Sequence, residues 1–165
     1  MEDSLRKLIL IFGLAAIAAA LGAQSPAAKV LYVYDEANDK SKPYIGYFEK
    51  ALADEGIAFD ETKASQVGSM DLTKYRAILV HGMVMAFASK SPVRDWLKAE
   101  KRLEGKKVSL FVTANRWFLD KLYKQLGDLL VKDKAGPVDA VSAATKKMDN
   151  AAKEAAVRTF VARLK

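Results

Sequence analysis

The chain of 165 residues is predicted to form an α/β domain in which a doubly wound, parallel sheet of five strands lies between two layers of helices. Three observations predict this class. Apolar runs of strand length alternate with segments of helical periodicity from Lys29 onward, the strongest runs are apolar at almost every residue, and glycine or proline interrupts the pattern between segments. Strands joined through helices run parallel in one sheet, and the order 2-1-3-4-5 is the natural doubly wound arrangement.

Five runs are predicted as strands. The first is β-branched and aromatic, the third is fully apolar, and the fifth is the weakest. In chain order they are residues 30–34, 57–62, 77–80, 108–112 and 138–144. Because the first and third strands are neighbours in this topology, we expect them to lie side by side and parallel at the centre of the sheet.

Four helices are expected between and after these strands. Pro43 and Pro92 stand where the first two begin, since proline fits a first helical turn, and Gly56 ends the first. The third helix carries leucines from Leu119 to Leu130, and the last covers residues 151–164. The loops expected at the edge where strands one, three, four and five end are residues 35–42, 81–91, 113–118 and 142–149.

The first 28 residues are predicted to be a signal peptide. Arg6 and Lys7 precede an apolar run over residues 8–21, and small residues follow up to residue 28. Cleavage fits loosely after residue 22 or after residue 27. The prediction is an exported domain over residues 29–165, periplasmic or extracellular, and membrane-anchored if the leader stays uncleaved.

Composition excludes several kinds of chemistry. The chain has no cysteine and one histidine, His81, so disulfides, thiolate nucleophiles and cysteine-ligated metal centres are excluded, and no metal site is predicted. A hydrolytic triad would need His81 and has no nucleophile elbow. The net charge of +7 favours acidic partners, such as a redox protein or anionic headgroups. No basic run is interleaved with aromatic residues, so nucleic-acid binding is not predicted.

One stretch resembles a known family. Residues 71–82 read DLTKYRAILVHG, which resembles the flavodoxin pattern D-L-x-x-Y-D-A-hydrophobic-G, and residues 88–97 and 104–111 continue it. They look most like the flavodoxin domains of the menaquinone-dependent protoporphyrinogen oxidase type. The similarity covers residues 29–165 in layout and 71–115 in motif. It implies a flavodoxin-like fold and an FMN cofactor.

The segment after the first strand departs from that family. Flavodoxins cradle the FMN phosphate there with a loop of hydroxyls and backbone amides. Residues 35–42 read DEANDKSK instead, with three carboxylates and no glycine. Non-covalent FMN binding of the usual kind is therefore not expected.

A second motif offers another way of holding FMN. Residues 139–145 read DAVSAAT and resemble the attachment motif of FMN carrier domains in extracytoplasmic redox proteins. The resemblance implies that a flavin transferase links FMN through its phosphate to Thr145, with Asp139 and Ser142 as the other motif residues. Ala143 stands where carrier domains usually have glycine. The alternative is an ordinary strand followed by Thr145 as a helix-entry residue.

Four further residues are candidates for flavin contact. Phe87 and Trp117 are aromatic residues of the predicted edge loops and could sandwich a flavin ring. Thr113 and Asn115 could hydrogen-bond the flavin edge, or could merely cap the next helix.

Other polar residues are interpreted as structural. His81 is expected to be a structural histidine, and no catalytic residue is assigned. Asp35, Glu36 and Asp39 are expected to form a solvated acidic turn, since they lack the ligand spacing of a cation loop.

Two functions remain open. The first is an exported flavodoxin-like FMN protein that exchanges electrons with a membrane or envelope redox partner. Its FMN is either bound non-covalently or linked covalently to Thr145. The second is an exported binding or structural module of the same fold that has lost its flavin site.

Overall fold

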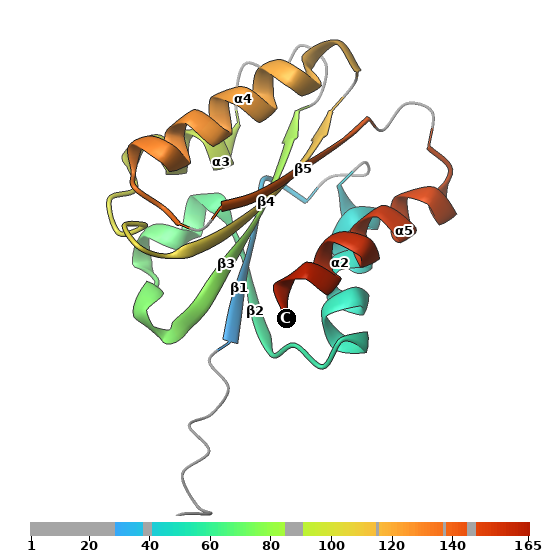
Figure 1. The fold of residues 1–165 in the computed structure, drawn as a ribbon, viewed down its shortest axis with the longest axis horizontal. Coiled ribbons are helices and arrows are strands. Elements are labelled where there is room, and N and C mark those ends of the chain that lie inside the picture. The colour runs from blue at the N-terminus through green and yellow to red at the C-terminus, as the bar shows by residue number, and fades with distance from the viewer. Residues whose placement is uncertain (1–28, 38–40, 85–90, 115, 137, 145–147) are drawn as a thin grey trace, which may run out of the picture.

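The computed structural model describes the backbone of residues 29–37, 41–84, 91–114, 116–136, 138–144 and 148–165. These residues form one five-stranded sheet, in which every neighbouring pair is parallel and the order is β2-β1-β3-β4-β5 (Figure 1). The strands are β1 Lys29–Tyr34, β2 Phe59–Lys63, β3 Tyr75–Val84, β4 Lys107–Ala114 and β5 Val138–Ala144. The predicted fold class and strand order are confirmed, including the parallel pairing of β1 with β3. The predicted signal peptide lies outside the described residues.

Helices cover both faces of the sheet. The two on one face are α2 Lys42–Asp54 and α5 Asn150–Val161, and those on the other are α3 Pro92–Ala99 and α4 Arg116–Lys132 (Figure 1). Short 3₁₀ turns complete the chain at Ala64–Ser69, Leu72–Lys74 and Ala162–Leu164. Alternate residues of each strand therefore enter two separate cores, as the period of two along a strand requires.

Strand β1 illustrates this division. Val30 and Tyr32 are buried in the core beneath α2 and α5, whereas Leu31 and Val33 are buried in the core beneath α3 and α4. A strand buried on both faces must be apolar at successive residues. This is why the apolar runs in the sequence predicted a sheet with helices on both of its faces.

Two strands extend further than the sequence predicts. Strand β3 continues through residues 81–84, which were assigned to a loop, and pairs with β4 from Ala77 to Val84. Strand β4 likewise includes Thr113 and Ala114, and α4 begins at Arg116, so most of the expected loop 113–118 is regular structure. The loop prediction was wrong at these ends because polar side chains there are satisfied by neighbouring strands, as described below.

The helix boundaries follow their local signals. Ser41 precedes α2, Pro43 stands in its first turn, and Gly56 adopts a φ of 65° just beyond its end. That positive φ favours glycine, which has no Cβ to clash. Ser91 caps α3 by accepting a hydrogen bond from the Arg94 amide at 3.2 Å.

Candidate functional site

The carboxyl edge is the edge of the sheet at which the parallel strands end. Helices α2, α3, α4 and α5 each follow the end of a strand there, so their N-termini are directed to the same edge (Figure 1). Helix N-termini carry a partial positive charge and unpaired amides, and open α/β folds bind ligands at this edge. This edge is the candidate site.

Asp35 directly follows β1 and lies inside this edge. Its carboxylate accepts hydrogen bonds from the amides of Met83 and Val93, each at 2.7 Å, and from the Ser91 hydroxyl at 3.3 Å. Burial raises the pKa of Asp35 to about 6, although these hydrogen bonds act in the opposite direction. The expectation of a solvated acidic turn is wrong for Asp35, because the ends of β3 and α3 supply donors that only the folded chain brings together.

Two other described residues of this segment, Glu36 and Ser41, are also engaged within the protein, and Asp39 lies outside the described residues. Glu36 is exposed and forms an ion pair with Lys63 at 3.2 Å. The hydroxyl of Ser41 is buried and donates to the carbonyl of Glu36 at 2.6 Å. The described residues of this segment therefore do not fit a hydroxyl cradle for a free phosphate.

His81 is the centre of a buried polar network. Its Nδ1 lies 3.2 Å from the hydroxyl of Tyr32, and its Nε2 lies 3.0 Å from Oγ1 of Thr113. Burial lowers the pKa of His81 to about 3, so the ring stays neutral at physiological pH. One ring nitrogen donates and the other accepts in the neutral form, and each faces a hydroxyl that can do either.

This network explains the extension of β3 and fixes the position of Thr113. His81 and Thr113 are both almost completely buried, and their side chains face the aromatic core beneath α2 and α5. Thr113 was a candidate for hydrogen bonding to a flavin edge. In the structure its hydroxyl is engaged with His81 inside the protein.

Tyr44 presents a buried hydroxyl in the first turn of α2. The ring packs against His81 and Phe111, with centroid distances of 5.5 and 6.4 Å, and the residue is 2% exposed. Its hydroxyl has no hydrogen-bond partner among the described residues, and burial raises its pKa to about 12. A buried donor without a partner costs about 1–3 kcal/mol. Nothing in the sequence pattern distinguishes Tyr44 from the other buried residues on this face of α2.

The structure separates Asp139 from the carboxyl edge. Asp139 is the second residue of β5, lies opposite Ser109 in the register, and pairs with Arg163 at 3.4 Å. The strand advances about 3.3 Å per residue, so Asp139 and Ala144 are about 16 Å apart. Ser142 lies further along β5, opposite Val112.

The remaining candidates lie partly or wholly outside the described residues. The backbone of Trp117 belongs to the first turn of α4. Phe87, Asn115 and Thr145 fall outside the described residues.

The described residues contain neither a helix that could cross a membrane nor a metal-binding cluster. No helix within them is both long enough and apolar enough to cross a membrane. No group of three or more histidine, aspartate or glutamate side chains within them is arranged to hold a metal ion.

Comparison with solved structures defines the class of the fold, which is that of the flavodoxins. Oxidised flavodoxin 2 from Bacillus cereus superimposes with a TM-score of 0.62 at 16% identity, covering 84% of this chain and 100% of that one. General stress protein 14 from Treponema denticola, solved in complex with FMN, gives 0.55 at 15% identity over 82% and 97% of the two chains. Rubredoxin:oxygen oxidoreductase from Desulfovibrio gigas gives 0.61 at 16% identity, and there the chain matches only 35% of the larger protein. No family model and no curated protein matches the sequence.

Proposed function

We propose that this flavodoxin-fold protein is an exported electron carrier that holds FMN at the carboxyl edge through a phosphoester to Thr145. The observation that supports the proposal is the course of β5. Six of the seven motif residues lie in this strand, and its last residue, Ala144, pairs with Ala114 at the end of β4. The motif thus runs toward the edge at which four helices begin.

A covalent link to FMN is also consistent with the polar groups at the carboxyl edge. The carboxylate of Asp35 is turned inward and Ser41 is engaged with Glu36, so the described residues of the segment after β1 do not supply a cradle for a free phosphate. A covalent link removes the need for that cradle. The N-terminus of α2, which no side chain caps, offers backbone amides and a partial positive charge to a cofactor held nearby.

The link would be formed by a flavin transferase. The oxygen of Thr145 would attack the phosphorus on the flavin side of a flavin dinucleotide, its proton would pass to a base, and the bond from that phosphorus to the bridging oxygen would break, so that the other nucleoside monophosphate leaves. No electron changes hands in this step. The basic leader and apolar run of residues 1–28 support export, and a membrane or envelope redox partner would then exchange electrons with the bound FMN.

The test is coexpression of the full chain with a flavin transferase, followed by intact mass and absorbance measurements. We expect a yellow protein whose mass is increased by one FMN less one water. Thr145→Val should abolish the added mass and leave the thermal unfolding transition unchanged, since valine keeps the β-branched shape and lacks only the hydroxyl. N-terminal sequencing of the envelope fraction should begin between Ala23 and Lys29 if the leader is cleaved.

Thr159→Val is the matched control, because Thr159 is an exposed threonine on α5 whose hydroxyl donates to the carbonyl of Ala155. It should retain the full flavin mass. Covalent flavin that survives in Thr145→Val would exclude the proposed link.

The second candidate is a binding module of the same fold without flavin. It is favoured by the buried position of Asp35. The carboxylate of Asp35 accepts hydrogen bonds from the amides of Met83 and Val93 at the carboxyl edge, so these amides are not available to a ligand. A folded, colourless wild-type protein of unmodified mass after coexpression would favour this candidate over the electron carrier.

A further inference from the structure

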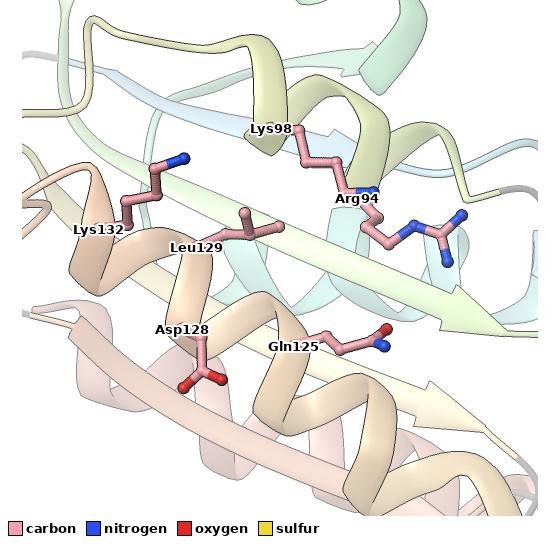
Figure 2. Close-up of a pocket in the computed structure, with 6 residues that line it drawn as sticks. All are labelled: Arg94, Lys98, Gln125, Asp128, Leu129 and Lys132. Carbon is pink, nitrogen blue, oxygen red and sulfur yellow. The ribbon is translucent and has the colours of Figure 1, made fainter.

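A groove runs between α3 and α4 on the face of the sheet opposite α2 and α5 (Figure 2). Its volume is about 330 Å³. The residues that line it come from both helices and are mostly basic or polar: Arg94, Lys98, Gln125, Asp128, Leu129 and Lys132. Figure 2 shows Arg94 and Lys98 on α3 and Lys132 extending from α4 toward that helix, whereas the carboxylate of Asp128 points away from α3.

The groove carries an excess of positive charge. Its one carboxylate, that of Asp128, is already paired with Lys124 at 2.8 Å. Among the described residues, Lys98 and Lys132 form no ion pair, and both are exposed. Nε of Arg94 forms an ion pair with Oδ1 of Asp95, the next residue of α3, at 3.7 Å. Ammonium groups that lack internal partners are available to an anion from outside.

The spacing of these cations matches a peptide better than a single small anion. Arg94 and Lys98 are four residues apart on α3, so they are separated by about 6 Å along the helix axis. Lys132 belongs to the opposite wall. Carboxylates one helical turn apart on a partner would face Arg94 and Lys98 in turn, while Leu129 offers an apolar contact between the polar groups.

We propose that this groove docks an acidic segment of a protein partner, with glutamate or aspartate side chains set against Arg94, Lys98 and Lys132. The inference stands apart from the flavin, because every group it uses lies on α3 and α4. It favours a protein over a lipid surface for a geometric reason. A bilayer presents a broad surface to convex regions of a protein, whereas these cations line a groove that a narrow segment can enter.

The test measures binding of a synthetic helical peptide with glutamates at i and i+4 to the purified full chain. We expect binding at low ionic strength that weakens as salt is added, because exposed charge pairs are screened. The combined variant Lys98→Glu and Lys132→Glu should weaken binding by about tenfold or more. Amide shifts in NMR spectra should map to α3 and α4.

The matched control reverses two lysines outside the groove, Lys74→Glu with Lys153→Glu, and so makes the same change in net charge. It should keep most of the affinity. The neutral variant Lys98→Gln with Lys132→Gln, checked by thermal unfolding, repeats the test without adding negative charge. Equal losses in groove and control variants, or no binding by the wild type, would overturn the proposal. So would vesicles of anionic lipid that bind through the groove while the peptide does not.

Discussion

Asp35→Asn is expected to remove a pH dependence of stability that lies between about pH 4 and pH 6. The pKa of Asp35 is about 6 in the folded protein, against an ordinary value of 3.8. One pKa unit corresponds to about 1.4 kcal/mol, so the difference amounts to about 3 kcal/mol in the free energy of unfolding. Between these two values the folded state binds more protons than the unfolded state. The contribution of Asp35 is therefore present below pH 3.8 and is lost as pH rises through about 6.

The assay is urea denaturation of the wild type and of Asp35→Asn at a series of pH values. The difference in unfolding free energy, wild type minus variant, should fall by about 3 kcal/mol across this window. A constant offset is also expected. The asparagine amide has one acceptor oxygen for the amides of Met83 and Val93, and a lost hydrogen bond there costs about 1–3 kcal/mol.

The comparison must use the difference between the two proteins, because His81 acts in the opposite direction. Its pKa is lowered from 6.5 to about 3, so its contribution is present above pH 6.5 and is lost as pH falls toward 3. Asp120→Asn, which replaces an exposed carboxyl on α4, is the matched control for the change from a carboxyl to an amide. Parallel wild-type and Asp35→Asn curves through pH 4–6 would refute the assignment of a buried, proton-binding Asp35.

Two further predictions concern buried polar groups. The imidazole of His81 should not titrate between about pH 5 and pH 8 in NMR spectra, and a midpoint near its ordinary pKa would show that the ring is solvated. Glu100→Gln should lower the unfolding free energy by about 2–4 kcal/mol in urea denaturation, because Glu100 is 5% exposed and accepts from the Trp96 indole and the Arg102 guanidinium. Glu104→Gln, which alters an exposed ion pair, is its control, and equal effects of the two substitutions would contradict the argument.

The fold could be predicted because its signals are local. Strands that are covered on both faces must be apolar at successive residues, and residues 30–34 and 77–80 satisfy this condition without reference to any neighbour. Pro43, Pro92 and Gly56 act through their own backbone conformations, so helix boundaries near them could be placed to within one or two residues.

The candidate site could be predicted less well, because its polar residues depend on distant partners. In the sequence, a histidine that follows a buried apolar run is typical of the start of a loop. In the structure, His81 belongs to β3, where its ring nitrogens are hydrogen-bonded to Tyr32 and Thr113 on the flanking strands. Asp35 in an acidic segment looks solvated, and only the approach of β3 and α3 buries it.

The sequence by itself determined the class of the fold, the parallel strand order and the segment that ends at Ala144, because apolar periodicity and backbone restrictions act within a few residues. The tertiary structure alone decided which polar groups are buried. Asp35, His81 and Tyr44 owe their protonation and burial to groups far away in the chain, and desolvation depends on all the atoms packed around a side chain. The charge of the groove between α3 and α4 was decided in the same way, since its walls come from separate helices that only folding brings together.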